Sequence, residues 1–341
     1  MKPSDFAYML TKYLSAYLPG QYNASENTVC AYRDTFKLLL RFAETQRNIC
    51  PERLTLADVD RAFVEGFLLW LETARGNAVS TRNHRLAGIH AFFRYLQSEK
   101  PDMMLQCQQV LSIPVKKTAK PTVNYLTVDA VKTILAMPDI STAYGMRDLA
   151  LLGLLYDTGA RVSELIRLRP KDLRLAAPPV VSILGKGRKS RQCPLSSEMA
   201  NHLIKYLSAW GLDAPAKSDH PLFVSHNAEK LTRAGVAYIL QKYVSAAHEK
   251  DTGIIPATVS PHMLRHSKAM HLLQAGVNLV YIRDWLGHSS VKTAEIYARA
   301  DSEMKRAALQ KAASAVMPYH GQQSSWSENI ELMKWLSSLG K

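Results

Sequence analysis

Hydrophobic residues in the first third of the chain recur every three or four positions, as they do along one face of an α-helix. Thr55 and Asp58 precede the second of these runs with the spacing of a variant capping box, so we expect a helix to open at Thr55. Residues 1–112 are therefore predicted to form a helical domain. The runs cover residues 27–46, 59–71 and 80–96.

This periodicity stops at residues 113–125. The stretch contains Pro114 and Pro121 together with three lysines, and its apolar residues follow neither a helical nor a strand period. Proline-containing segments without periodicity are typical of linkers between domains. We therefore expect a basic linker here, which either follows a phosphate backbone or is simply solvated.

The pattern after the linker is mixed. Thr127 opens a helix, and Thr158-Gly159 interrupts a long apolar helix that resumes over residues 160–168. A short apolar run predicts a strand over 180–184, and a glycine-rich turn after it allows a return strand over 192–195. Helical patterns follow to residue 315. The predicted fold is mainly α with a small antiparallel β-sheet in a second domain, residues 126–318.

Residues 319–341 form a tail with its own helical signal. Ser325 and Glu328 have capping-box spacing, Gly340 is a candidate C-cap, and Trp326 and Trp335 contribute to an apolar face. Such an amphipathic helix either docks on its own domain or serves as an arm that docks on a neighbouring protomer.

Chain length and net charge limit the classes of function that fit this sequence. A chain of 341 residues is long enough for two domains, and 43 basic against 29 acidic residues give a net charge of +14. This charge favours a polyanionic partner, nucleic acid before a membrane surface. No apolar run approaches the roughly 18 residues of a membrane span, and no signal peptide is evident. Four scattered cysteines argue against a disulfide framework and favour a reducing cytoplasm.

Basic residues gather in three places that suit a DNA backbone: a helix in the first domain, the linker and the predicted turn. The alternative for each is an ordinary solvated face. The candidate DNA-binding residues are Arg82, Arg85, Lys116, Lys117, Arg188, Lys189 and Arg191.

Arg161 follows the Thr158-Gly159 break inside an apolar region, where an arginine is costly to bury unless it is paired. Glu164 lies three residues later on the same helical face and can pair with it. Lys186 lies between two glycines, which allow the backbone to approach a ligand closely. The spacing around Lys186 is not that of a Walker motif.

A helix start at Ser260-Pro261 places His262 and Arg265 on one face, where the partial positive charge of the helix end suits a phosphate. His262 and His266 also have the spacing of metal ligands. However, residue 263 is methionine rather than the glutamate of zinc proteases, and no third ligand is evident, so no metal is expected.

His288 follows a glycine, and Ser289 or Ser290 can cap a helix that carries Tyr297. A tyrosine on an amphipathic helix is most often a core residue with a satisfied hydroxyl. Locally, nothing distinguishes Tyr297 from the other tyrosines.

Taken together, these motifs resemble the tyrosine recombinase (phage integrase) family. The words TGARVSEL, GKGRKSR, HMLRH and LGHSSVKTAEIY have the order and spacing of that family, including nine residues from His288 to Tyr297. The resemblance is strong over residues 125–300 and weaker over 1–112, which looks like the N-terminal core-binding domain of the family. It implies a two-domain clamp around DNA.

The resemblance also implies roles. Tyr297 would be the nucleophile that forms a 3′-phosphotyrosyl link, and Arg161 and Arg265 would hold the non-bridging phosphate oxygens. Lys186 would be the general acid for the 5′-oxygen. His262 and His288 would position the phosphate and assist proton transfer, while Glu164 would orient Arg161. The covalent link preserves the bond energy, so neither ATP nor a metal cofactor is expected.

By the same resemblance, the partners would be double-stranded DNA with specific recombination sites, three further copies of the chain in a tetramer on two duplexes, and accessory DNA-bending or directionality proteins. The reaction would be integration, excision, dimer resolution or transposition. A type IB topoisomerase and a non-catalytic DNA-binding factor of the same fold are the alternatives. A basic metabolic enzyme has no motif in its favour.

Overall fold

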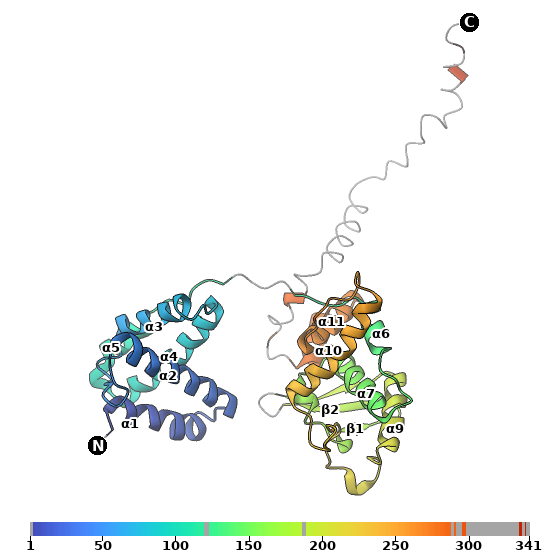
Figure 1. Ribbon diagram of the computed structural model, residues 1–341, viewed down its shortest axis with the longest axis horizontal. Helices are drawn as coiled ribbons and strands as arrows, with labels where there is room; N and C mark the ends of the chain where they lie inside the picture. The colour runs from blue at the N-terminus through green and yellow to red at the C-terminus, as the bar shows by residue number, and fades with distance from the viewer. Residues whose placement is uncertain are drawn as a thin grey trace. The chain divides into compact units, whose positions relative to one another are not determined.

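The computed structural model divides into two compact units, residues 1–121 and 122–341. The residues that the structure describes are 3–118, 123–185, 189–287, 290, 295–297, 334, 335 and 338. In Figure 1 the first unit runs from blue to cyan, and the second runs from green to orange.

The first unit is helical, as its apolar period predicts. Helix α2 begins after Ser25, whose hydroxyl accepts a hydrogen bond from the Thr28 N–H, and it ends at a left-handed Asn48. The elements are α1 (Asp5–Lys12), the π-helical turn η1 (Tyr13–Gln21), α2 (Glu26–Arg47), α3 (Arg61–Thr73), α4 (Val79–Glu99), the 3₁₀ turn η2 (Pro101–Met103) and α5 (Met104–Leu111).

The expected helix start at Thr55 is wrong. The Asp58 carboxylate does accept hydrogen bonds from the backbone and hydroxyl of Thr55, at 2.8 and 2.6 Å. These bonds close a turn rather than a helix, and α3 begins six residues later, at Arg61. Its cap is Asp60, whose carboxylate accepts from the Phe63 N–H. A local capping pattern therefore identified a real turn but placed the helix too early.

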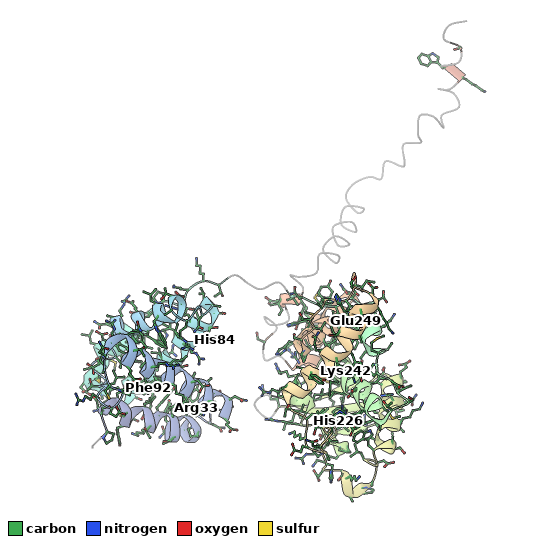
Figure 2. All side chains as sticks on the ribbon, in the orientation of Figure 1. Arg33, His84, Phe92, His226, Lys242 and Glu249 are labelled. Atoms are coloured by element: carbon green, nitrogen blue, oxygen red, sulfur yellow. The ribbon has the colours of Figure 1, made fainter. Side chains whose placement is uncertain are left out.

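Aromatic residues fill the core of this unit. Phe92 of α4 packs edge-on against Phe6 and Phe36, with ring centroids 6.0 and 5.1 Å apart. Figure 2 shows Phe92 among the helices and His84 at the periphery of the unit. Helix α4 thus has a buried aromatic face and an exposed face.

The expectation that the basic residues of α4 form one exposed face is wrong for Arg82. This arginine is 6% exposed, and its guanidinium donates to the Pro114 carbonyl at 3.1 Å. Arg85 is half-buried and donates to the Ala31 carbonyl and the Thr35 hydroxyl of α2. Both guanidiniums therefore hold the unit together.

The first part of the expected linker packs on this unit. Ile113 is 3% exposed, and the amide of Asn83 both donates to the Lys116 carbonyl and accepts from the Lys116 N–H. The Lys116 ammonium also pairs with Glu72 at 2.6 Å. At the other end, the Leu126 N–H donates to the Ser267 hydroxyl of the second unit. The start of the 113–125 stretch is thus part of the first unit, and the residue directly after the stretch is anchored in the second unit.

The second unit combines helices with a small sheet. Its helices are α6 (Val128–Leu135), α7 (Ala143–Thr158), α8 (Val162–Leu165), α9 (Ser197–Ala209), α10 (Arg233–Lys250), α11 (Pro261–Gln274) and α12 (Leu279–Leu286), with 3₁₀ turns η3 (Pro170–Asp172) and η5 (Pro215–Lys217). The strands are β1 (Leu173–Arg174), β2 (Val180–Leu184) and β3 (Ser190–Pro194). The predicted class, mainly α with a small antiparallel sheet, is confirmed.

The sheet is antiparallel in the order β1-β2-β3, with Ile183 opposite Arg191 and Val181 opposite Cys193. Val181, Ile183 and Cys193 are fully buried, so one face of the sheet packs on the core. The strand predicted over 180–184 is correct. The two-residue β1 is too short to leave a periodic signal, and it was not predicted.

Gly159 ends α7 in the left-handed conformation, with a φ of 57°. The expected helix over residues 160–168 is wrong, because only Val162–Leu165 is helical and the chain then turns toward the sheet. The break at Gly159 contributes to the site, because it leaves the Gly159 carbonyl able to accept a hydrogen bond from the side chain of Arg265.

Gly159→Ala is expected to destabilise the second unit by at least ~2 kcal/mol. A Cβ there would lie 2.7 Å from Cδ2 of the fully buried Leu286, and the left-handed backbone adds about 1 kcal/mol. Gly276→Ala is the matched control, because Gly276 has a φ of 83° but open space around it. Thermal unfolding of both variants should show the larger loss for Gly159→Ala. Equal losses would mean that the contact with Leu286 adds nothing.

Among the described residues, the helices are too short or too polar to cross a membrane. All four cysteines are free thiols. The expected tail helix over 325–339, with its cap residues and Trp326, lies largely outside the described residues. Within the tail, Trp335 is helical and 57% exposed.

Candidate active site

Glu164 lies at the centre of the charged cluster in the second unit. Its side chain is 5% exposed and accepts from the Arg161 guanidinium at 2.9 Å and from the Arg191 guanidinium at 2.8 Å. The Arg161 N–H also donates to the same carboxylate, so Glu164 caps α8 as well. The predicted pair of Arg161 with Glu164 is present, and Arg161 retains a side chain that is 34% exposed.

Burial alone would raise the pKa of Glu164, but the hydrogen bonds from Arg191 and Arg161 outweigh it and hold the pKa below its usual value. Its charge therefore stabilises the fold above the pKa of the unfolded chain, about 4.3, and this stability is lost as the pH falls through the lower pKa of the folded state.

Glu164→Gln is expected to lower the free energy of unfolding by about 3 kcal/mol at pH 7, because two guanidiniums lose their buried anion. The difference from wild type should shrink below about pH 4, where the wild-type carboxylate also becomes neutral. Thermal unfolding across pH 3 to 8 measures it. Asp129→Asn, at an exposed pair with Lys132, is the control and should change little. A difference independent of pH would contradict this account.

Arg191 is placed differently from the sequence-based expectation of a DNA contact. Its side chain is 11% exposed, and its Nε–H donates to the Trp285 carbonyl at 2.9 Å. A Cβ on Gly287 would lie 2.9 Å from the Arg191 guanidinium, so the glycine at the end of α12 leaves room for it. Arg191 therefore ties β3 to α12 and to Glu164.

Arg265 is 3% exposed on α11 and donates to two backbone carbonyls, those of Gly159 at 2.5 Å and Leu286 at 2.6 Å. Each carbonyl belongs to a helix C-terminus, where backbone acceptors lack partners within the helix. Burial first, and the nearby Arg161 second, lower the pKa of Arg265 to about 10, so the guanidinium remains charged at neutral pH.

The helix start at Ser260-Pro261 is confirmed, and its cap is the bond from the Met263 N–H to the Ser260 hydroxyl. His262 is exposed, and its ring stacks on that of His266, with centroids 6.3 Å apart. Among the described residues, no group of three His, Cys, Asp or Glu side chains is placed to hold a metal ion.

Tyr297 lies against α11, although it is far away in the sequence. It is 1% exposed, in a cluster with Met270, Leu273 and Leu286, and its hydroxyl lies 3.0 Å from Nδ1 of His266. Burial raises the pKa of Tyr297 above 10, while the charges of Arg265 and Arg161 act in the opposite direction. The hydroxyl is therefore within electrostatic range of both arginines.

The site thus brings together Arg161, Glu164, His262, Arg265 and Tyr297, and it adds Arg191 and His266. Lys186, Arg188 and His288 lie outside the described residues. Lys117 and Lys189 are exposed. The sequence offered one signal for His266, its one-turn spacing from His262, but that spacing suggested a metal ligand rather than a partner of Tyr297.

Each of the two units matches a known family of protein domains. Residues 124–304 match the phage integrase family. Residues 10–100 match the phage integrase N-terminal SAM-like domain.

Full-length relatives agree. The chain is 39% identical over 339 residues to "Putative integrase/recombinase y4rC" of Sinorhizobium fredii, and the match covers 99% of each chain. It is 32% identical over 295 residues to tyrosine recombinase XerC of Syntrophus aciditrophicus, covering 84% of this chain and 92% of the relative.

Two solved structures share the fold. The XerH site-specific recombinase bound to difH substrate, a pre-cleavage complex, has a TM-score of 0.63 at 24% identity, covering 88% of this chain and 83% of that one. The Tn1549 transposon integrase in complex with a circular intermediate DNA has a TM-score of 0.68 at 18% identity, covering 89% and 99%. With the family models and the full-length relatives, these likenesses establish that the chain belongs to the phage integrase family of tyrosine recombinases, enzymes that cut and rejoin DNA at specific sites.

Proposed function

We propose that Tyr297 is the nucleophile of this recombinase. Its phenolic oxygen attacks a DNA phosphodiester, a 3′-phosphotyrosyl bond forms, and the bond to the 5′-oxygen breaks. The placement of the Tyr297 hydroxyl against α11, 3.0 Å from His266 and within the field of Arg265 and Arg161, carries the proposal.

Arg161 and Arg265 are proposed to hold the non-bridging oxygens of the reacting phosphate. Two of the five N–H groups of Arg265 are used by backbone carbonyls, so donors remain for a ligand. Arg161 is the more exposed arginine, and Glu164 fixes its direction. Preorganised guanidiniums stabilise the charge that develops on a five-coordinate phosphorus.

Lys186 and His288 complete the proposed machinery on the strength of their motifs. A lysine at a glycine-flanked turn can give its proton to the 5′-oxygen, which an arginine does not readily do. His288 and the exposed His262 are proposed to position the phosphate.

The proposed partner is duplex DNA with specific recombination sites, which the net charge of +14 favours. The exposed Lys117 and Lys189 are proposed to contact phosphates, whereas Arg82 and Arg191 are internal braces. Four copies would assemble on two duplexes in the cytoplasm, with accessory proteins. Residues 1–112 would be the core-binding domain, residues 126–318 the catalytic domain, and residues 319–341 a docking arm.

Covalent trapping tests the proposal. The full chain is incubated with nicked duplexes from the DNA that flanks its own gene, in EDTA and without ATP, and adducts are separated on denaturing gels. Nuclease digestion and mass spectrometry of the tryptic peptides then locate the linked residue. We expect the DNA-derived mass on the peptide that contains Tyr297. A mass on another residue, or no adduct despite salt-sensitive binding to the same duplexes, would overturn the assignment.

Supercoiled plasmids without the mapped site separate this function from a type IB topoisomerase. A site-specific recombinase should leave them supercoiled, while a topoisomerase would relax them as a monomer. Relaxation at the rate of adduct formation would favour the topoisomerase.

A further inference from the structure

His266 has no role in the chemistry assigned so far, yet its ring touches the reacting oxygen. Nδ1 lies 3.0 Å from the Tyr297 hydroxyl, and the two ring centroids are 5.7 Å apart. His266 directly follows Arg265 on α11, so one helix carries both the buried guanidinium and the imidazole that faces the tyrosine.

We propose that His266 is the catalytic base of the cleavage step, and that its Nδ1 takes the hydroxyl proton of Tyr297 as the phenolic oxygen attacks phosphorus. This role replaces the assistance from His262 and His288 that family resemblance suggests. It deepens the proposed function and rests on it, because it requires Tyr297 to be the nucleophile.

The step balances within the site. The O–H bond of Tyr297 breaks, an N–H bond forms on His266, and the new O–P bond forms. The bond between phosphorus and the 5′-oxygen breaks, and that oxygen takes a proton from Lys186 and leaves as a 5′-hydroxyl. Religation runs in reverse, and the imidazolium of His266 returns its proton to the leaving phenolate. This mechanism requires the Tyr297 hydroxyl to stay within hydrogen-bond distance of Nδ1 of His266 when the DNA phosphate enters the site.

The surroundings of His266 suit a base. Burial first, then the charges of His262 and Arg265, lower its pKa, so the ring is neutral at pH 7 and can accept a proton. Burial raises the pKa of Tyr297, so the phenolate does not form by itself. A base beside the hydroxyl therefore removes a barrier that the two arginines only partly offset.

His271, five residues further along the same helix, offers a matched control. Its Nδ1 lies 2.8 Å from the hydroxyl of Tyr156, and its Nε2 lies 2.9 Å from the Leu126 carbonyl. Burial lowers the pKa of His271 as well. The two histidines thus share a helix, a tyrosine partner and partial burial, but Tyr156 is not the proposed nucleophile.

The test is the single-turnover rate of adduct formation on the mapped nicked duplex. His266→Asn retains an acceptor near the position of Nδ1 but cannot take up a proton at neutral pH. We expect its cleavage rate to fall about 100-fold, with unchanged DNA affinity, whereas His271→Asn stays within a few-fold of wild type. His266→Ala should regain at least about tenfold in rate when imidazole is added, which a purely structural loss would not allow.

A second substrate separates the base from the general acid. In a duplex with sulfur in place of the bridging 5′-oxygen, the leaving thiolate needs no proton. The defect of Lys186→Ala should largely disappear on this substrate, and the defect of His266→Asn should remain.

Three results would overturn the inference. A His266→Asn cleavage rate equal to or above that of wild type would show that His266 only holds the hydroxyl in its resting position. Relief of its defect by the sulfur substrate would place His266 at the leaving group instead. Equal losses in His266→Asn and His271→Asn, with matching losses of thermal stability and no imidazole rescue, would reduce the role to packing. A wild-type protein without a Tyr297 adduct would instead refute the proposed function itself, before any His266 variant is made.

Discussion

Tyr297→Phe is expected to abolish the covalent adduct and to slow strand cleavage by at least ~10⁴-fold, the scale on which loss of a nucleophile acts. The substitution removes one oxygen from a side chain that is 1% exposed and leaves the ring in its cluster with Met270 and Leu273. The fold should survive, at a cost of about 1–3 kcal/mol, because His266 loses a buried hydrogen-bond partner.

The control for this variant is Tyr156→Phe, which removes the hydroxyl from the other histidine–tyrosine pair on α11. Both variants should bind the duplex with the salt dependence of wild type, and both should unfold at similar temperatures. Adduct formation should vanish for Tyr297→Phe alone. An adduct that persists in Tyr297→Phe would assign the nucleophile to another residue.

The sequence predicted the elements with strong periods and the pairs within one helical turn. Helix α2, strand β2 and the Arg161–Glu164 pair each depend on residues close together in the chain, and each is where the pattern placed it. The helix start expected at Thr55 is wrong because that prediction also depends only on residues close together in the chain. A local hydrogen-bond pattern is compatible with a turn as well as a helix, and only the packing of the following apolar face decides between them.

The contacts that complete the site join residues far apart in the chain, and no local pattern shows them. Arg191 is 27 residues from Glu164 and 94 from Trp285 along the chain. The sequence alone therefore shows Arg191 only as one of several cations in a basic turn. Only the pairing of β3 with β2 and the approach of α12 convert it into an internal brace. In the sequence His266 is likewise only a second histidine on a helix. The fold places the Tyr297 hydroxyl beside it.

A single helix, α11, connects the stability of this unit with its chemistry. Arg265 fastens the ends of α7 and α12, and the next residue, His266, faces the proposed nucleophile. Any variant of α11 therefore needs a measure of folding beside the measure of cleavage.

Arg265→Lys is expected to slow cleavage by about 10³-fold, because a lysine loses the planar fork that binds phosphate oxygens in two directions. It should also cost about 2 kcal/mol of stability. The guanidinium donates from two nitrogens to the Gly159 and Leu286 carbonyls, and a single ammonium leaves one of these acceptors buried without a partner. Cleavage is measured well below the unfolding temperature, so that the two losses are recorded separately.

Arg283→Lys on α12 is the matched control, because its guanidinium pairs at the surface with Asp284 at 2.7 Å. This variant should retain wild-type cleavage and lie within about 0.5 kcal/mol of wild type. If Arg265→Lys cleaved within a few-fold of wild type while losing the expected stability, Arg265 would serve the fold alone. The charge on the reacting phosphate would then depend on Arg161, whose partly exposed guanidinium Glu164 already holds in place.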